Sequence, residues 1–225
     1  MTRKWLLLVD FDGTVTDRDA DFVIADAALG PQGAALYAPL VESYERLEIG
    51  TREYFERLLD LLRIAPDQLV RCAKAVALRP GFDLLVRWCR EAGVALRIVS
   101  EGLDLYIEPI LRRHGLGHLE LSCNRAQFDG RRYRILPPPQ AEPCARCLNC
   151  KGEHVRRAQS AGLAVALIGN GASDLCAARL ADLVLARDGL IDRCREQGIP
   201  HVTWRDFEEA LAALERHVGR HIHPR

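Results

Sequence analysis

Short apolar runs alternate with amphipathic segments along most of this sequence, and this alternation constrains the fold more than any other feature. The apolar runs have the length and composition of buried strands, and the segments between them carry apolar residues at helical spacing. Strands that alternate with helices form a parallel sheet with helices on both faces. We therefore expect an α/β fold with a Rossmann-like core. The expected strands are residues 4–9, 94–99, 119–123, 164–168, 183–186 and 201–204.

Residues 18–77 depart from this alternation. Apolar residues there recur at helical spacing with charged residues between them, and the segment contains no strand candidate. Gly30-Pro31, Gly50 and Pro66 divide it into about four helices.

The bounds of this helical segment divide the chain. We expect residues 1–16 and 79–225 to form the α/β core, and residues 17–78 to form a small, all-helical cap inserted after the first strand. Within the core, residues 123–150 are expected to form a hairpin that turns at Asp129-Gly130, followed by a cysteine-rich loop.

Composition and charge exclude several function classes. Apolar residues make up 48% and charged residues 28% of the chain, as in an ordinary soluble globular protein. The 31 basic residues balance the 31 acidic residues, so no net field attracts the chain to nucleic acid or to an anionic membrane. The first apolar run, residues 5–9, is too short for a membrane span or a signal peptide. We therefore expect a cytoplasmic protein, monomeric or homodimeric, that binds neither nucleic acid nor membranes.

Polar side chains follow the apolar runs at the points where the expected strands end. Ligands of open parallel sheets gather at the carboxyl ends of the strands, so these side chains should meet in one crevice. Acids, a hydroxyl and an ammonium group would converge there, and such groups bind magnesium and phosphate. The side chains are those of Asp10, Asp12, Ser100, Asn170 and Asp174, with Lys151 at the start of a helix.

Asp10 and Asp12 are the strongest part of this set. Two acids at one strand end destabilise each other unless a cation neutralises them or one is protonated. Magnesium prefers a few carboxylates together with water and phosphate oxygens, so it suits the pair. Gly13 lets the backbone turn away directly after them. The alternative is a simple turn, because Asp-Gly-Thr is also common turn sequence.

The other members of the set are weaker on their own. Ser100, followed by Glu101 and Gly102, could bind phosphate with the neighbouring backbone amides or could simply cap a helix. Lys151 alone could be an ordinary solvated lysine. Their order at successive strand ends is what favours a shared site.

Four motifs occur in the order that is typical of one enzyme superfamily. They are DFDGTVT with Asp10, VSEG with Ser100, CKGEH with Lys151 and GNGASD with Asp174. Over nearly its whole length the chain resembles the haloacid-dehalogenase-type (HAD) phosphatases, which implies a HAD core. The helical segment between the first and second motifs is similar to the cap of the phosphoserine-phosphatase-like branch.

Finer similarities concern the substrate. The runs SCNRAQFDG, from Ser122, and LARDGLIDRCREQGI, from Leu185, are similar to the methionine-salvage phosphatases acting on 2-hydroxy-3-keto-5-methylthiopentenyl-1-phosphate. The cysteines before Lys151 and the run GNGASDLCAA also resemble phosphoethanolamine and phosphocholine phosphatases. The implied substrate is a small phosphorylated metabolite.

The resemblance also implies a role for each motif residue. Asp10 would attack phosphorus and form an aspartyl-phosphate, and Asp12 would protonate the leaving alcohol and then activate water. Mg²⁺ would be bound by Asp10, by the backbone carbonyl of Asp12 and by the fourth motif. The implied metal ligands are Asp10, Asp12, Asn170 and Asp174, and the implied phosphate-binding residues are Ser100, Glu101, Gly102 and Lys151.

Asn170 departs from the family pattern, which usually has an aspartate at this position. An amide oxygen can bind magnesium but brings no charge, so weaker metal binding is expected. Asp174 or a high magnesium concentration could compensate. Three functions remain open: a phosphatase with an adapted site, a catalytically weakened protein that binds a phosphorylated ligand, and a phosphotransferase.

Eight cysteines in a chain expected in the cytoplasm predict reduced thiols or metal ligands rather than disulfides. Cys144, Cys147 and Cys150 have the spacing of thiolate ligands, and Cys123 at a strand end is the candidate fourth ligand of a structural Zn²⁺ ion. Unligated thiols and an iron–sulfur cluster are the alternatives. The remaining cysteines are interpreted as small core residues: Cys72, Cys89, Cys176 and Cys194.

Substrate selection is expected from the cap. Polar residues there could contact the part of a substrate that lies beyond its phosphate. The candidates are Asp17, Asp21, Glu42 and Tyr44.

Overall fold

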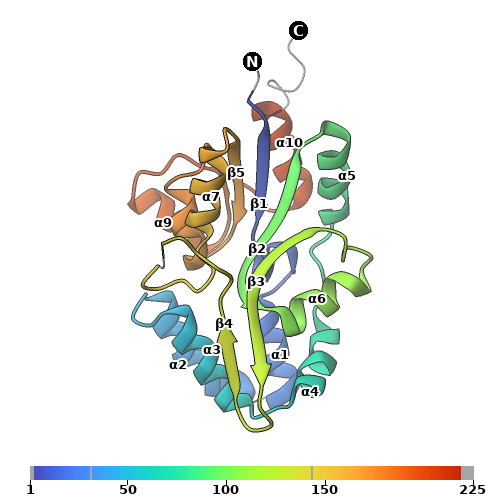
Figure 1. The fold of residues 1–225 in the computed structure, drawn as a ribbon, viewed down its shortest axis with the longest axis vertical. Helices are drawn as coiled ribbons and strands as arrows, with labels where there is room; N and C mark the ends of the chain where they lie inside the picture. The colour runs from blue at the N-terminus through green and yellow to red at the C-terminus, as the bar shows by residue number, and fades with distance from the viewer. Residues whose placement is uncertain (1–2, 31, 143, 219–225) are drawn as a thin grey trace.

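The centre of the molecule is a seven-stranded sheet, seen in a computed structural model that describes residues 3–30, 32–142 and 144–218 (Figure 1). The strands lie in the order β4-β3-β2-β1-β5-β6-β7, and neighbours are parallel except β3 and β4, which are antiparallel. The predicted α/β fold with a parallel sheet is therefore confirmed. The strands are β1 (Trp5–Val9), β2 (Ala95–Leu103), β3 (Glu120–Phe128), β4 (Tyr133–Leu136), β5 (Ala164–Gly169), β6 (Leu183–Ala186) and β7 (Val202–Thr203).

Strand β1 lies in the middle of the sheet, between β2 and β5. Because side chains alternate along a strand, Leu6 and Leu8 pack in one core cluster, and Leu7 and Val9 pack in the larger cluster on the other face. A strand buried on both faces needs apolar residues at every position, which explains the continuous apolar run.

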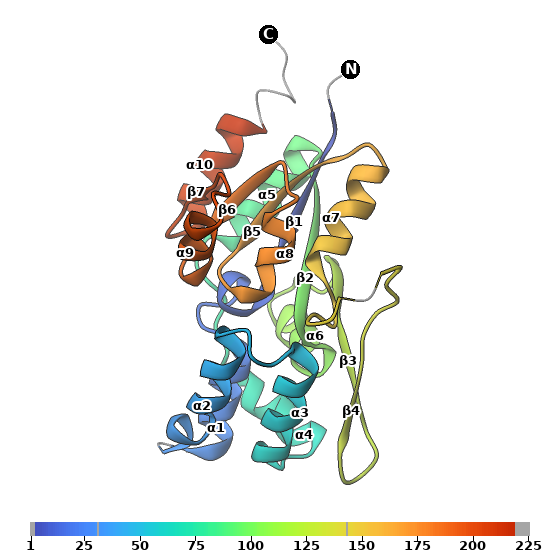
Figure 2. The ribbon, with the colours of Figure 1, turned by 90° about the vertical axis from the view of Figure 1, so that its left-hand side faces the viewer.

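Helices cover both faces of the sheet (Figures 1 and 2). Buried side chains of α7 (Lys151–Ser160), α8 (Leu175–Ala178) and α9 (Gly189–Glu196) pack in the smaller cluster. Those of α5 (Phe82–Ala92), α6 (Asp104–Arg113) and α10 (Phe207–His217) pack in the larger one. The sequence analysis did not predict α9, a short helix of eight residues that buries only Leu190 and Cys194.

Four helices between β1 and α5 lie beyond the carboxyl ends of the core strands (Figure 2), and we call this segment the helical insert. The helices are α1 (Ala20–Leu29), α2 (Gly33–Glu45), α3 (Thr51–Leu62) and α4 (Pro66–Cys72), and a 3-10 turn, η2 (Ala73–Ala75), follows them. Helix α3 shows the reason for its position. Its apolar residues recur at helical spacing and are buried, whereas the charged residues between them stay in solvent.

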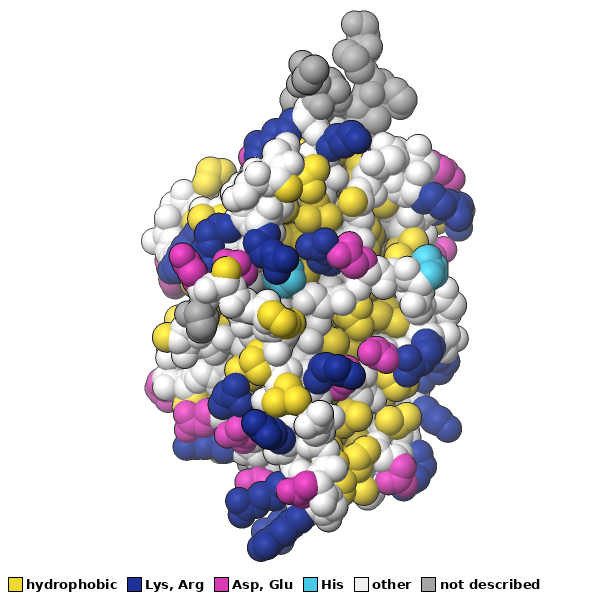
Figure 3. All heavy atoms as spheres, in the orientation of Figure 1, with side chains coloured by type: hydrophobic (Ala, Val, Ile, Leu, Met, Phe, Trp, Pro, Cys, Tyr) yellow, Lys and Arg dark blue, Asp and Glu magenta, His cyan; other side chains and the backbone are white. Residues whose placement is uncertain are grey.

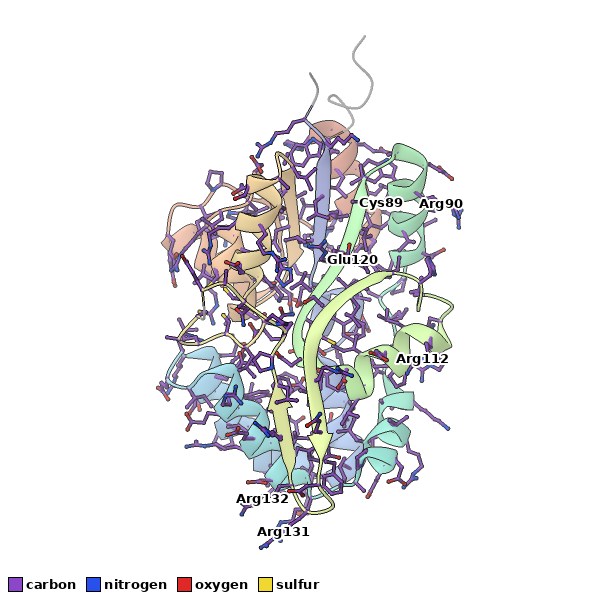
Figure 4. The ribbon with its side chains drawn as sticks, viewed as in Figure 1. Cys89, Arg90, Arg112, Glu120, Arg131 and Arg132 are labelled. Atoms are coloured by element: carbon purple, nitrogen blue, oxygen red, sulfur yellow. The ribbon has the colours of Figure 1, made fainter. Side chains whose placement is uncertain are left out.

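Strand β3 continues beyond the sheet as the first arm of a hairpin. It pairs with β2 through its first half and with β4 through its second half. At the turn, the carboxylate of Asp129 accepts hydrogen bonds from the backbone N–H groups of Arg131 and Arg132, both at 2.8 Å. The two arginine side chains extend from the hairpin tip, beside the helical insert (Figure 4). The expected hairpin is present, but its first arm forms one strand with the predicted strand 119–123.

The described helices include none that is long and apolar enough to cross a bilayer. On the face shown in Figure 3, Lys and Arg side chains are scattered among acidic and apolar ones and do not form a stripe.

Candidate active site

A strongly acidic pocket lies where β1, β2 and β5 end, against the helical insert. Parallel strands bring their carboxyl ends to one edge of the sheet, so residues far apart in the sequence meet there. Aromatic side chains of the insert, those of Tyr44, Tyr54 and Phe55, form part of its wall. The acids that line it are Asp10, Asp12, Asp19, Asp21, Glu45 and Glu101.

Lys151 is the centre of a buried charge cluster. Its Nζ lies 2.5 Å from Asp10 Oδ1 and 2.7 Å from Asp174 Oδ1, and it donates a hydrogen bond to Ser173 Oγ at 2.9 Å. The three charged side chains are buried. Burial alone would lower the pKa of Lys151, but the two carboxylates raise it well above its ordinary value, so the lysine stays protonated.

Backbone amides hold Asp174 in place. Its Oδ2 accepts hydrogen bonds from the N–H groups of Asn170, at 2.9 Å, and Gly171, at 3.0 Å. Strand β5 ends one residue before Asn170, and the 3-10 turn η3 (Ala172–Asp174) folds the carboxylate back over the strand end. Both oxygens of Asp174 therefore have partners, one of which is Lys151.

The chain leaves β1 through a tight turn, η1 (Phe11–Val15), that carries Asp12. Gly13 has a φ of 71°, and a side chain at that position would collide with those of Asn170 and Asp19. Glycine is required there for both reasons. The close approach brings Asp19, which the sequence analysis did not select, beside the first acid position of the fourth motif.

Arg79 holds the same turn through its backbone carbonyl groups. Its buried guanidinium donates hydrogen bonds to the carbonyl oxygens of Gly13, at 2.9 Å, Thr14, at 3.1 Å, and Asp17, at 2.8 Å. The guanidinium also donates to the carbonyl oxygen of Thr16, so it binds four backbone carbonyls of this loop. In the sequence Arg79 marked only a domain boundary, and no local signal there reveals these contacts.

Asp12 accepts hydrogen bonds from three elements outside its own loop, one of which is the Ala20 N–H at the start of α1, at 3.3 Å from Asp12 Oδ1. Ser100 Oγ donates to Asp12 Oδ2 at 3.0 Å, and Tyr106 Oη donates to the same oxygen at 3.3 Å. Burial, reinforced by the charge of Asp21, raises the pKa of Asp12 to about 7. Asp12 can therefore carry a proton near neutral pH. Tyr106 was not predicted, because it falls in ordinary amphipathic helical sequence.

Ser100 does not cap a helix. Strand β2 continues through it to Leu103, past a register shift against β3, and α6 begins at Asp104. The Ser100 hydroxyl accepts a hydrogen bond from the Gly102 N–H at 2.8 Å while it donates to Asp12. The alternative that Ser100 simply caps a helix is therefore wrong, and the bulged end of β2 instead turns the hydroxyl toward Asp12.

Glu101 lines the pocket and also binds the cysteine-rich loop. Its Oε2 accepts a hydrogen bond from the Leu148 N–H at 3.0 Å, and burial raises its pKa. The sequence analysis grouped Glu101 with the phosphate-binding residues. When it is ionised, the Glu101 side chain would add negative charge to the pocket at this point.

The acids of the pocket raise one another's pKa values. Burial and the charge of Asp174 raise the pKa of Asp10 to about 8, and burial and the charge of Asp12 raise that of Asp19 to about 7. Asp21, which accepts a hydrogen bond from Tyr54 Oη at 2.6 Å, is raised to about 7 by burial and by Asp19. Carboxylate and amide oxygens in such excess over Lys151 fit a divalent cation of the magnesium type.

Two of the four cap residues expected to select substrate line this pocket, and two do not. Asp21 and Tyr44 belong to the lining. Asp17 instead pairs with Arg79 at 3.2 Å, and Glu42 pairs with Arg46 at 2.5 Å on the exposed side of α2. Helical periodicity did not distinguish the lining residues Glu45, Tyr54 and Phe55 from other helix positions.

The cysteine group also differs from the prediction. Cys123 does not belong to it. The neighbouring residue Ser122 faces the cysteine-rich loop and donates a hydrogen bond to Asn149 Oδ1 at 3.3 Å. Because side chains alternate along a strand, Cys123 points to the opposite face, toward α6. Cys176 of α8, interpreted as a core residue, takes that place. The four thiols whose Sγ atoms lie within 4.8 Å of one another are those of Cys144, Cys147, Cys150 and Cys176.

Comparison with known proteins identifies the family. The haloacid dehalogenase-like hydrolase family matches residues 7–179, a range that contains all four motifs. The chain belongs to this family. The resemblance inferred from the motifs is thus confirmed, and the chain is an enzyme of the hydrolase class.

Relatives of known name cover nearly the whole chain. The 2-hydroxy-3-keto-5-methylthiopentenyl-1-phosphate phosphatases of Brevibacillus brevis and Geobacillus kaustophilus are each 33% identical to it, over 96% of this chain and 97% and 98% of their own lengths. A solved phosphoserine phosphatase, described as a phospho-aspartyl intermediate analogue, superposes with a TM-score of 0.73. It is 20% identical and covers 94% of this chain and 99% of its own, which shows the shared fold alone.

Proposed function

We propose that this protein is a magnesium-dependent phosphatase that hydrolyses a small phosphate monoester through an aspartyl-phosphate on Asp10. The observation that carries the proposal is the buried contact of Lys151 with Asp174 and with Asp10, which lines the acidic pocket together with Asp12. A nucleophile, a cation for phosphate oxygens and a group for proton transfer then lie together at one edge of the sheet. The phosphatase relatives support this assignment.

The reaction proceeds in two displacements. A carboxylate oxygen of Asp10 attacks phosphorus, the bond from phosphorus to the ester oxygen breaks, and Asp12 gives its proton to the leaving alkoxide. Water then attacks the aspartyl-phosphate while Asp12 takes up a proton, and the bond to Asp10 breaks to release phosphate. The raised pKa of Asp12, about 7, suits a group that both donates and accepts a proton near neutral pH.

Lys151 and Ser100 position the phosphoryl group. The ammonium already contacts Asp10, so it can move onto a phosphate oxygen with little displacement. The Ser100 hydroxyl and the Gly102 N–H lie together at the end of β2 and can donate to a second oxygen. Asp174 acts through Lys151, because its own oxygens are already held by that lysine and by the loop amides.

Magnesium, when bound, offsets the negative charge between the nucleophile and the phosphate. Asp10, the backbone carbonyl of Asp12 and the amide oxygen of Asn170 would hold it. Asp19 lies beside Asn170 and supplies a carboxylate where the amide brings no charge. The adapted site is therefore favoured over a weakened one.

The helical insert is the proposed cap over the substrate. It contacts the core through Thr51, whose N–H donates to Arg146 O at 2.9 Å, and through Glu45, whose carboxylate pairs with Arg193 at 2.8 Å. The cavity that remains is about 70 Å³, which suits the phosphate end of a small metabolite. The names of the relatives make the methionine-salvage phosphate ester the first candidate substrate.

A second candidate is a phosphate ester that carries an amino or quaternary ammonium group, such as phosphoethanolamine or phosphocholine. The observation that favours it is the lining itself, in which Asp21 and Glu45 stand with the aromatic rings of Tyr44 and Tyr54. Carboxylates and aromatic faces both attract cations.

Phosphate release from a panel of esters tests these assignments. The panel contains the methionine-salvage ester, phosphoethanolamine, phosphocholine, phosphoserine and p-nitrophenyl phosphate, each with magnesium and with a chelator. We expect magnesium-dependent hydrolysis with the highest kcat/KM for the methionine-salvage ester, and none by Asp10→Asn. Binding without turnover would indicate a weakened protein, and phosphorylated acceptors formed at the expense of free phosphate would indicate a phosphotransferase.

A further inference from the structure

The cysteine-rich loop and α8 together form a compact group of four thiols. Cys144, Cys147 and Cys150 come from the loop, Cys176 comes from α8, and their Sγ atoms all lie within 4.8 Å of one another. In a tetrahedral zinc–thiolate site with bonds of about 2.3 Å, the sulfur atoms lie roughly 3.8 Å apart. The thiols are therefore already close to the separation that one ion requires.

We propose that Cys144, Cys147, Cys150 and Cys176 bind one Zn²⁺ ion as a closed tetrathiolate site. Four protein ligands leave no open position, so the ion is structural rather than catalytic. A four-iron cluster fits less well, because each of its thiolates binds a different iron atom and the sulfurs must lie farther apart than those that share one ion.

The site lies between two parts of the proposed catalytic machinery. Cys150 directly precedes Lys151 at the start of α7, and Cys176 follows Asp174 by two residues. The two helices meet so closely that a Cβ atom at Gly152 would lie 2.9 Å from the carbonyl oxygen of Cys176. A zinc ion bound to Cys150 and Cys176 would fix Lys151 relative to Asp174. The distance from Lys151 Nζ to Asp174 Oδ1 is 2.7 Å.

The same loop also connects to the pocket and the helical insert. The Leu148 N–H donates to Glu101, and Arg146 O accepts a hydrogen bond from the Thr51 N–H at the start of α3. Between its cysteines the loop therefore touches a pocket residue and the insert. Zinc would keep the loop in the position that makes these contacts, without touching the substrate.

Metal content tests the site independently of the proposed phosphatase activity. We expect the wild-type protein, purified without chelators from medium that contains zinc and iron, to hold one zinc ion per chain. Cys176→Ser should lose the zinc, whereas Cys123→Ser, which changes the neighbouring thiol excluded by the geometry, should keep it. The reverse result would transfer the fourth ligand to Cys123 and overturn the assignment.

Cobalt substitution and thiol titration make the test independent of whether the variants fold. Co²⁺ in place of zinc should give the visible absorption of a tetrahedral tetrathiolate, and a mercurial should release one zinc ion from the wild-type protein as the thiols react. Four results would each overturn the proposal: iron with labile sulfide, iron alone, no bound metal, or fewer than eight titratable thiols in denaturant.

The positioning effect has its own readout. Removal of zinc from the wild-type protein should lower the thermal midpoint and reduce kcat for p-nitrophenyl phosphate, and re-added zinc should restore both. Zinc at the predicted stoichiometry without any phosphatase activity would leave the metal site standing and would overturn only the proposed function.

Discussion

The side-chain amide of Asn170 and the carboxylate of Asp19 face each other directly beside Gly13. Asn170 donates a hydrogen bond to Asp19, while its Oδ1 accepts one from Thr14 Oγ1 at 3.2 Å. An aspartate at position 170 would have no proton to donate and would stand carboxylate to carboxylate with Asp19. Asparagine at position 170 and aspartate at position 19 therefore act as a complementary pair that keeps one negative charge between them.

Asn170→Asp should change metal binding and metal-free stability in opposite directions. The additional carboxylate should lower the magnesium concentration that gives half-maximal activity, because it adds a charged ligand. Without metal, the repulsion from Asp19 should destabilise the variant by about 1–3 kcal/mol at neutral pH. Magnesium titration of activity, with chemical denaturation in a chelator, measures the two effects. An unchanged magnesium dependence would show that position 170 does not bind the ion.

The exchanged pair gives the control. In the double variant Asp19→Asn with Asn170→Asp, the donor and the acceptor trade places and the total charge is the wild-type charge. We expect the metal-free stability to return close to the wild-type value. Stability that stays as low as in Asn170→Asp would mean that the two side chains do not act as a pair.

The sequence analysis succeeded where local pattern and sheet topology decide the outcome. Continuous apolar runs mark strands buried on both faces, and parallel strands bring their ends together. Asp10, Ser100, Lys151 and Asp174 could therefore be assigned to one edge of the sheet before any geometry was known, and Ser100 and Lys151 contact the two acids of the first motif there.

The analysis failed where a contact depends on which face a side chain takes or on how distant elements pack. Cys123 and Cys176 exchanged roles because a one-residue step along β3 reverses the side chain, and because α8 packs against the loop. Arg79 and Asp19 reach the site through the turn at Gly13, which sequence spacing does not encode. Interpretation of the helical insert as a separate cap domain stays a prediction.

Asp10→Asn should abolish turnover and leave the fold intact. The amide cannot attack phosphorus, so the rate should fall by about 10³-fold or more. Lys151 keeps its contact with Asp174, which preserves the buried ion pair. Initial rates with p-nitrophenyl phosphate and circular dichroism measure the two properties. Substantial magnesium-dependent hydrolysis by this variant would assign the nucleophile to another residue.

Lys151→Met should cost stability as well as activity. The substitution leaves Asp10 and Asp174 buried without their cation, and breaking a buried pair in this way typically costs about 3–5 kcal/mol. Lys74→Met, at an exposed position, is the matched control and should change the free energy of unfolding little. Equal stability of the two variants would show that the cluster around Lys151 is not charged in the folded protein.

The stability of the metal-free protein should decrease as the pH rises. Asp12, Asp19 and Asp21 each have a pKa of about 7 in the folded protein, well above the ordinary value of 3.8, so each binds its proton more tightly there than in the unfolded chain. Their contribution to the free energy of unfolding is complete below about pH 4 and is lost as the pH rises to about 8.

Chemical denaturation in a chelator, between about pH 5 and about pH 8, measures how steeply the free energy of unfolding falls with pH. Asp21→Asn should make this slope shallower, because one of the repelling carboxylates is gone. Asp26→Asn is the control: the hydrogen bond from Tyr37 lowers the pKa of Asp26, so its contribution is already constant in this range and the slope should not change. Saturating magnesium should reverse most of the loss at the alkaline end, because the cation binds the ionised carboxylates. Stability that rises with pH in the chelator would show that the pocket acids are ionised without a metal.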